Sequence, residues 1–238
     1  MTVINGYEQS DRNEKLDILN LPSLEARAKK IIPQGGFGYI VGGAEDEWTL
    51  QQNTKAFSHA QIVPKALSNI ENPDLSTTVF GIDLKTPVMM APAAAQGLSH
   101  SLGEKATAQG VAAVGGLMSQ STYSSVSIAD TQAAAPDAPQ FFQLYMSKDW
   151  DFNNALLDEA MKAGVKGIIL TVDATVDGYR EQDIINNFQF PIPMANLERF
   201  AAGDGKGKGI GEIYAAAAQK ISEADVRRIA EYTNLDYS

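Results

Sequence analysis

The sequence predicts an α/β fold built around a parallel sheet. Short apolar runs recur at intervals of about 25–30 residues from position 88 onward, and a segment of helical character separates each run from the next. A strand followed by a helix, repeated at such a period, is typical of βα units whose strands pair in parallel. The predicted strands are Val88–Ala91, Gly115–Met118, Gln140–Tyr145 and Gly167–Val172.

Helices are expected at Glu104–Val114, Ser127–Ala134, Phe152–Ala163 and Ser222–Thr233. In the last of these, Ser222 is a predicted N-cap and Asp225 stands at the third helical position, which approximates a capping box. Either a doubly wound sheet or a (β/α)₈ barrel fits this order of elements. A barrel requires eight βα units and roughly 250 residues, so the four units found here would form half of one.

Residues 1–84 are expected to form a helical segment and a small hairpin ahead of the sheet. Ser23 can cap a helix with Leu24, Ala28, Ile31 and Ile32 on one face, because these positions recur at helical spacing. The remaining predictions are a break at Pro33 and Gly35-Gly36, a helix at Glu45–Phe57, and a hairpin at Thr77–Leu84 with its turn at Gly81-Ile82-Asp83.

Composition excludes several classes of function. Nineteen Lys and Arg against 29 Asp and Glu give a net charge of −10, which argues against nucleic-acid binding. The sequence has no cysteine, so disulfides, thiol catalysis and Fe–S clusters are excluded, and with only two histidines it argues against a zinc site. Met1–Asp17 lacks an apolar signal region and Pro87–Ala95 is too short to span a bilayer. We therefore expect a cytoplasmic protein without a membrane partner.

Polar side chains follow or end three consecutive predicted strands, in pairs two residues apart. The pairs are Ser119 and Ser121, Gln143 and Tyr145, and Thr171 and Asp173. Residues two apart on a strand face the same side, and ligands of parallel α/β folds bind at the carboxyl ends of strands. One pair could arise by chance, whereas three in succession favour a ligand with a polar edge. The small residues of Ala91–Ala95 either pack tightly or admit a flat ligand to the backbone.

Other motifs do not match known sites. Gly203–Gly211 fits neither the G-x-G-x-x-G fingerprint nor a P-loop and is expected to be a surface loop. Asp173–Gly178 begins like a calcium loop but has Ile184 where a glutamate is required. His59 and His100 are expected to be structural or surface residues. Arg180 could form a salt bridge with Glu181 or Asp183, or bind a carboxylate.

Six segments occur in a recognisable order. They are Gly35–Ile40 (GGFGYI), Met90–Ala94 (MAPAA), Ser119–Ser121 (SQS), Phe141–Tyr145 (FFQLY), Leu170–Asp173 (LTVD) and Arg180–Ile184 (REQDI). Together they resemble the FMN-dependent α-hydroxy acid oxidase family, from about Leu19 to Leu235. The resemblance implies a (β/α)₈ TIM barrel preceded by helices and a hairpin. In this single domain, residues 1–84 are the preamble and residues 85–238 the first half of the barrel, with four of its βα units.

The resemblance also assigns roles to individual residues. It places Pro92, Ala93 and Ala94 along the flavin, and Ser121, Gln143 and Thr171 at its pyrimidine side. It assigns substrate binding to Tyr39, Tyr145, Arg180 and Tyr214, with Tyr145 also a catalytic residue and Tyr214 on a lid that includes residues 203–211. Phe190 stands where a tyrosine is expected.

The implied reaction is the FMN-dependent oxidation of a small L-2-hydroxy acid, with lactate and O₂ giving pyruvate and hydrogen peroxide, in a homo-oligomer that is a tetramer in the family. The family's later strands and its histidine base have no counterpart in these residues. We therefore expect this chain alone to be inactive or nearly so, since loss of a general base costs roughly a hundred- to ten-thousand-fold in rate. Two alternatives remain open: a non-catalytic fragment stable only with a complementary half or another copy, and an unrelated α/β protein that binds a small ligand.

Overall fold

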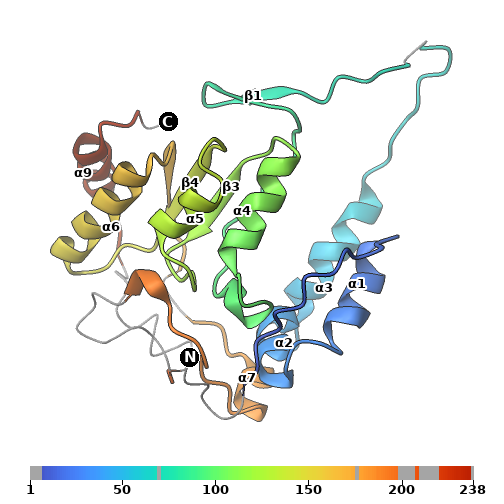
Figure 1. Ribbon diagram of the computed structural model, residues 1–238, viewed down its shortest axis with the longest axis horizontal. Coiled ribbons are helices and arrows are strands. Elements are labelled where there is room, and N and C mark those ends of the chain that lie inside the picture. Colours follow the sequence, from blue (N-terminus) through green and yellow to red (C-terminus); the bar gives the residue numbers. More distant parts are fainter. Residues whose placement is uncertain (1–6, 69–70, 175–176, 198–206, 209–219, 237–238) are drawn as a thin grey trace.

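The computed structural model describes residues 7–68, 71–174, 177–197, 207–208 and 220–236, and its centre is a three-stranded parallel sheet (Figure 1). The strands β3 (Met118–Ser121), β4 (Gln140–Leu144) and β5 (Gly167–Leu170) lie side by side in chain order. Every residue of β3 and β4 is buried, and β5 is half-buried. The predicted α/β class with a parallel sheet is confirmed.

The first predicted strand, Val88–Ala91, is reduced to a single bridge. Met90 pairs in parallel with Met118: its N–H donates to the Leu117 carbonyl at 2.9 Å, and its carbonyl accepts from the Ser119 N–H at 2.9 Å. On the carboxyl side Pro92 has no N–H to donate, and on the amino side the Val88 N–H donates to Thr86 Oγ1 at 3.3 Å, so a regular ladder does not extend in either direction. The segment nevertheless runs beside β3.

The second predicted strand, Gly115–Met118, lies too early in the chain. Gly115 has a φ of 67° and turns the backbone after α4, so the strand begins only at Met118. The run at 115–118 was predicted as a strand because it is apolar, but most of it forms the turn that precedes β3. As a result Ser119 and Ser121 lie within β3 and not after it.

Four helices cover the sheet, and their predicted bounds are correct to within two residues. These are α4 (Glu104–Ala113), α5 (Ile128–Ala134), α6 (Trp150–Ala163) and α9 (Glu223–Thr233), which pack in that order, each against the next (Figure 1). The Asp149 carboxylate caps α6 by accepting from the Asp151 and Phe152 N–H groups, so this helix starts before Phe152. The predicted capping box of α9 forms: the Asp225 carboxylate accepts from the Ser222 N–H at 2.8 Å.

The first helix, α1 (Leu21–Ala28), is capped by Asn20 and not by Ser23. The Asn20 side chain accepts from the Ser23 N–H at 2.9 Å, which places Ser23 in the first turn. The helix ends before Ile31 and Ile32, so the predicted four-residue apolar face does not form. The helix predicted at 45–57 is shorter as well: α3 (Trp48–Lys55) continues into the 3₁₀ helix η2 (Ala56–His59).

A helix, α2 (Gln34–Val41), occupies the predicted break around Gly35 and Gly36. Gly36 is buried, and a Cβ there would overlap the Tyr7 hydroxyl. Glycine therefore permits close packing at this position, although it usually weakens a helix. The short helix α7 (Glu181–Ile185) packs against α2.

The predicted hairpin is confirmed as β1 (Thr77–Val79) and β2 (Ile82–Leu84), an antiparallel pair. Its turn is Phe80-Gly81, one residue before the predicted position, and both residues have positive φ as a two-residue hairpin requires. Leu84 is buried against Leu117 and Phe141 at the amino ends of β3 and β4. Polar side chains lie at the opposite end of the sheet, where β3, β4 and β5 terminate.

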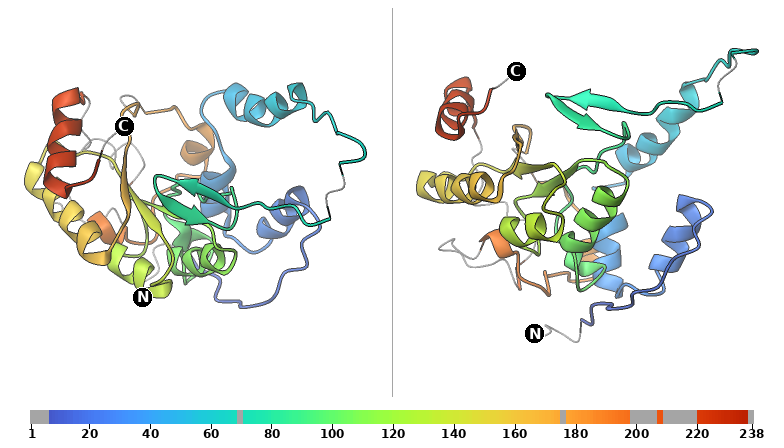
Figure 2. Two further views of the ribbon diagram at one scale, coloured as in Figure 1. Left: turned by 90° about the horizontal axis from the view of Figure 1, so that it is seen from above. Right: turned by 45° about the horizontal axis from the view of Figure 1, so that its top comes forward.

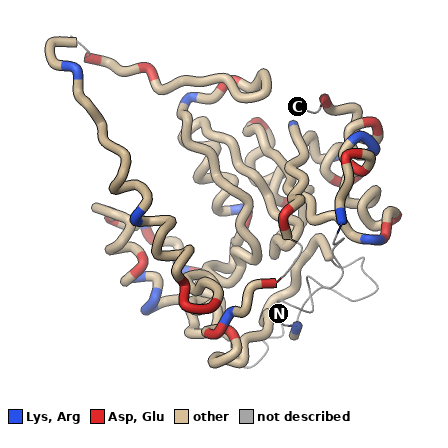
Figure 3. The backbone as a smooth tube through the Cα atoms, turned by 180° about the vertical axis from the view of Figure 1, so that it is seen from behind, with Lys and Arg blue, Asp and Glu red and all other residues tan. Residues whose placement is uncertain are grey.

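Residues 60–68 and 71–76, between η2 and the hairpin, extend away from the sheet and return to it, as both views in Figure 2 show. Charged residues lie on the helices and the outer segments, and none occurs in β3, β4 or β5 (Figure 3). Among the described residues, no helix is long and apolar enough to cross a membrane. Two short 3₁₀ helices, η3 (Gln96–Leu98) and η4 (Ala195–Leu197), lie near the carboxyl end of the sheet.

Candidate functional site

A row of three hydrogen-bonded side chains crosses the carboxyl end of the sheet. The Ser121 hydroxyl on β3 donates to Gln143 Oε1 on β4 at 3.2 Å, and Gln143 Nε2 donates to Thr171 Oγ1 just after β5 at 2.8 Å. Ser121 and Gln143 are each 3% exposed, and Thr171 is half-buried. The parallel register places Ser121 directly opposite Gln143. The structure thus brings together the three side chains that the sequence predicted for the cofactor.

Thr122 completes this row and was not predicted. Its hydroxyl donates to the Gln143 carbonyl at 2.7 Å and accepts from the Tyr145 N–H at 3.0 Å. Its own N–H donates to Gln143 Oε1 at 3.3 Å. The Gln143 side chain is therefore held in one orientation from β3 and from β5. A threonine next to a predicted site residue gave no distinct signal in the sequence.

The predicted small-residue turn follows the bridge at Met90. Pro92, Ala93 and Ala94 are each half-buried, and the Ala95 N–H donates to the Tyr123 carbonyl at 2.9 Å. This bond places the turn beside the segment that follows Ser121.

Two groups of aromatic side chains lie near the row. Tyr123 and Tyr145 stack with ring centroids 4.9 Å apart, and Tyr39 packs against Phe188 at 5.3 Å and against Phe190 at 5.0 Å. All belong to one apolar cluster. Burial raises the pKa of Tyr39 to about 12, against the opposing effect of the Arg180 cation, and burial also raises the pKa of Tyr123. Both hydroxyls are therefore protonated at neutral pH and able to donate.

Arg180 forms the salt bridge with Asp183 and not with Glu181. Its Nε lies 2.5 Å from Asp183 Oδ2, while its Nη1 and Nη2 donate to the Gly42 and Tyr39 carbonyls at 3.0 and 2.6 Å. The guanidinium also lies 5.1 Å from the centroid of the Tyr39 ring. Arg180 thus holds the carboxyl end of α2 and fixes the position of Tyr39. Three of its five donors are engaged in these contacts.

Some predicted residues fall elsewhere. Tyr214 lies outside the described residues, as does the 203–211 stretch apart from Gly207 and Lys208. Those two residues pair with Phe190: the Gly207 N–H donates to the Phe190 carbonyl at 2.8 Å, and the Phe190 N–H donates to the Lys208 carbonyl at 3.0 Å. Phe190 itself is fully buried beside Tyr39.

The two histidines of the sequence are not part of the row. His100 accepts from the Leu102 N–H at Nδ1, so its Nε2 carries the hydrogen that is donated to the Arg12 carbonyl at 3.1 Å. His59 lies exposed on η2. The described residues contain no group of three or more His, Asp and Glu side chains that could hold a metal ion.

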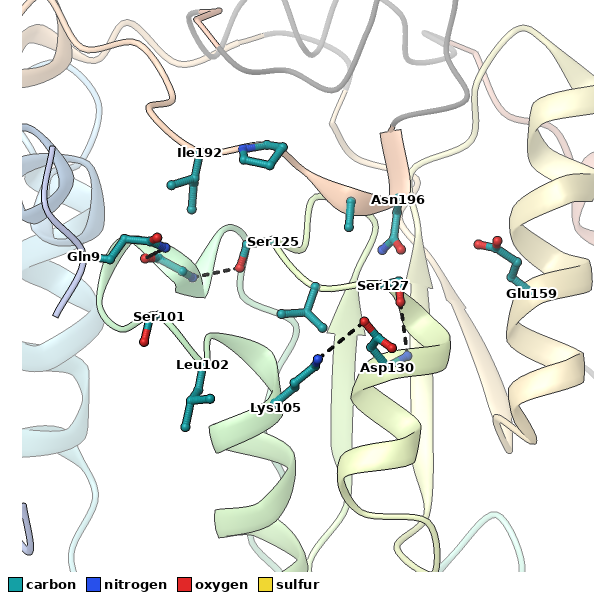
Figure 4. Close-up of a pocket in the computed structure, with 14 residues that line it drawn as sticks. Gln9, Ser101, Leu102, Lys105, Ser125, Ser127, Asp130, Glu159, Ile192 and Asn196 are labelled. Atoms are coloured by element: carbon teal, nitrogen blue, oxygen red, sulfur yellow. Dashed lines mark hydrogen bonds and ion pairs between the residues drawn. The ribbon is translucent and has the colours of Figure 1, made fainter. Parts of the chain in front are cut away.

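A cavity of about 560 Å³ lies beside the predicted site, on the outer side of the turns that follow Met90 and β3 (Figure 4). None of the predicted site residues lines it. Lys105 pairs with Asp130 at 3.4 Å across its floor, and Ser127 accepts from the Asp130 N–H (Figure 4). Many of its polar groups therefore contact one another. Ser125 lines the cavity and also belongs to the turn that follows β3, so the cavity adjoins the predicted site.

These features first define a class of protein: an α/β domain with uncharged donors and acceptors at the carboxyl end of a parallel sheet, and with tyrosines and an arginine near them. Residues 28–236 match the FMN-dependent dehydrogenase family, and the chain belongs to this family. Its members are oxidising enzymes of 2-hydroxy acids, and their relationship to this chain extends over almost its whole length.

Within this family, the chain is most informatively compared with individual lactate oxidases. The chain is 72% identical to an L-lactate oxidase of Lentilactobacillus hilgardii over 99% of its length and 64% of the relative's. It is 48% identical to an L-lactate oxidase of Lactobacillus jensenii, over 99% of its length and 58% of the relative's. The crystal structure of a Pediococcus acidilactici lactate oxidase superposes with a TM-score of 0.90 at 71% identity, over 98% of this chain and 63% of that one. The chain thus spans about three-fifths of these proteins. Family membership excludes the alternative of an unrelated ligand-binding protein.

Proposed function

We propose that this chain forms the flavin-binding and substrate-binding part of an L-lactate oxidase, built on the first half of a (β/α)₈ barrel. The observation that carries the proposal is the hydrogen-bonded row of Ser121, Gln143 and Thr171, found in a chain 72% identical to an L-lactate oxidase. In the whole enzyme, L-lactate and O₂ would give pyruvate and hydrogen peroxide.

The residues present fit the ring system of FMN. An isoalloxazine ring is planar and carries uncharged donors and acceptors along its pyrimidine edge, so amide and hydroxyl groups match it without burying an unpaired charge. Thr171 and the second hydrogen of the Gln143 amide would bond that edge, with Ser121 behind them. Pro92, Ala93 and Ala94 would lie along the ring. When bound, FMN supplies the redox chemistry, accepting hydride from the substrate and passing the electrons to O₂.

The substrate would lie between the ring and the aromatic residues. Arg180 provides a permanent cation near Tyr39, and a carboxylate could take the guanidinium donors that Asp183, Gly42 and Tyr39 leave available. Tyr39 stays protonated far above neutral pH and would donate to the substrate. Tyr145 would bond the hydroxyl or carboxylate beside the reacting carbon, and Tyr214 would contribute from the lid.

The proton of the substrate hydroxyl needs a base, and neither histidine of the described residues stands at this row. His100 uses both ring nitrogens in local hydrogen bonds, and His59 lies exposed on η2. Phosphate groups bind in such barrels to loops after the last strands, so FMN held by this chain alone would bind weakly. We propose that the whole enzyme supplies these groups, that it is a homo-oligomer, and that this chain alone produces little or no peroxide.

The proposal is tested by adding L-lactate or D-lactate, without oxygen, to the purified chain saturated with FMN. We expect L-lactate to perturb the visible spectrum of the bound flavin at lower concentration than D-lactate, with little reduction of the flavin. A spectrum equally unaffected by both acids would contradict the substrate assignment. Rapid peroxide formation from L-lactate in air would contradict the proposed need for a further base.

A further inference from the structure

Glu104, the first residue of α4, is a fully buried carboxylate. Its Oε1 accepts from the N–H groups of Gln96 and Ser125, each at 3.0 Å. Its Oε2 accepts from the Ser125 hydroxyl at 2.6 Å and from the Val126 N–H at 3.1 Å. No ion pair to Glu104 occurs among the described residues. Four donors thus take the place of water around this charge, which would otherwise be very unfavourable to bury.

These four bonds join two turns that are distant in the sequence. One is the 93–97 turn after the bridge at Met90, and the other is the 122–126 turn after β3. Ser125 strengthens the connection, because its hydroxyl donates to Glu104 and also accepts from the Gly97 N–H at 2.8 Å. Ala95 adds a direct bond from its N–H to the Tyr123 carbonyl at 2.9 Å.

The 93–97 turn has a backbone conformation that needs such support. Ala95 has φ 49° and ψ 45°, in the left-handed region that residues with a Cβ rarely adopt. The Gln96 side chain also fixes the turn from within, since its Nε2 donates to the Ala93 carbonyl at 3.3 Å while its Oε1 accepts from the Thr107 hydroxyl. The carboxylate of Glu104 therefore holds the middle of a strained turn.

We propose that Glu104 is a positioning residue of the flavin site. It fixes the 93–97 turn, which contains Ala93 and Ala94, against the 122–126 turn that follows Ser121. It does so through the N–H groups of Gln96, Ser125 and Val126, without itself touching the ring. This inference rests on the proposed function and extends it to a residue that lies outside the row.

Hydrogen exchange of the chain without FMN tests the positioning. Glu104→Gln keeps the size of the side chain but points an N–H₂ group at groups that are themselves donors. We expect the Gln96, Ser125 and Val126 amides to exchange at least about tenfold faster, with β4 amides such as that of Phe142 nearly unchanged. Glu231→Gln, at an exposed carboxylate on α9, is the matched control and leaves all of these amides unaffected. Unchanged exchange in the turns, or equal acceleration in β4, would overturn the proposal.

Ser125→Ala is the milder variant if Glu104→Gln does not fold. It removes one donor to Glu104 and the acceptor of the Gly97 N–H, so the Gly97 and Gln96 amides are expected to exchange faster while β4 keeps its protection. Unaltered Gly97 and Gln96 exchange would again overturn the proposal.

FMN titration of the same variants separates this inference from the proposed function. If the unmodified chain binds FMN, Glu104→Gln is expected to weaken binding about tenfold or more and to shift the visible spectrum, whereas Glu231→Gln does neither. Equal affinity and spectrum would refute a role at the flavin. If the unmodified chain binds no FMN, the proposed function of this chain fails, and hydrogen exchange still decides whether Glu104 holds the two turns.

Discussion

Gln143 Nε2 donates to Thr171 Oγ1 across 2.8 Å, and this bond joins β4 to the residue that follows β5. On its other side, Gln143 Oε1 accepts from Ser121 and Thr122. An amide that accepts from one neighbouring strand and donates toward the other has a defined orientation, because its oxygen and nitrogen cannot exchange places. The site therefore has a fixed order of donors and acceptors before any ligand binds.

The buried phenol of Tyr39 makes stability depend on pH in the alkaline range. Its pKa is raised by burial from 10 to about 12. Below pH 10 both the folded and the unfolded chain keep the proton, so the protonated Tyr39 phenol contributes fully to the stability of the folded chain. Between pH 10 and 12 only the unfolded chain loses it, and the free energy of unfolding falls by about 1.4 kcal/mol per pH unit for this group.

Urea unfolding at several pH values checks this prediction. Tyr39→Phe is expected to make the alkaline loss of stability shallower, although the raised pKa of Tyr123 still contributes some of it. A loss that is equally steep in the variant would show that Tyr39 titrates normally in the folded chain.

Gly36 is expected to be intolerant of any side chain. Gly36→Ala places a methyl group on the Tyr7 hydroxyl and is predicted to lower the free energy of unfolding by about 1–3 kcal/mol. Gly110→Ala is the control, because Gly110 lies on α4 with nothing near its missing Cβ. That change is predicted to stabilise the chain by about 0.5–1 kcal/mol. Denaturant titration of both variants measures the difference, and similar effects would contradict the described packing.

Arg180 is expected to resist replacement even by lysine. A lysine ammonium cannot reach Asp183 and the carbonyls of Tyr39 and Gly42 together, so Arg180→Lys is predicted to cost about 1–3 kcal/mol of stability. Arg227→Lys alters an exposed ion pair with Glu223 and is predicted to cost at most about 0.5 kcal/mol. Equal losses in urea unfolding would refute the structural role of the guanidinium.

The extended segment before the hairpin is expected to drive self-association. Ile62, Val63 and Leu67 are 95%, 87% and 102% exposed, and apolar side chains gathered on a surface favour contact with another copy of the chain. The double change Ile62→Lys and Leu67→Lys is predicted to lower the average mass measured by light scattering at high concentration. A strictly monomeric unmodified chain at all concentrations would contradict this prediction.

The sequence predicted the elements whose signals are local. The βα pattern located the four helices, and the strand ends indicated three polar pairs. The family resemblance then selected Ser121, Gln143 and Thr171 from these pairs. The helix at Gln34–Val41 was missed because its glycines are helix-weakening locally and are favourable only once Tyr7 packs on Gly36. Glu104 was missed because a glutamate in the first turn of a helix is common on a surface, and only the tertiary fold brings Gln96 and Ser125 to it.

FMN titration of the chain and of its Gln143→Leu variant tests whether the row of Ser121, Gln143 and Thr171 binds the flavin, with Gln51→Leu on exposed α3 as the matched control. We expect the unmodified chain and the control to quench flavin fluorescence at the same FMN concentrations. Gln143→Leu is expected to require at least about tenfold more FMN, because its buried polar partners are left unpaired. Equal affinity of all three proteins for FMN would contradict the assignment of the Ser121, Gln143 and Thr171 row to the flavin.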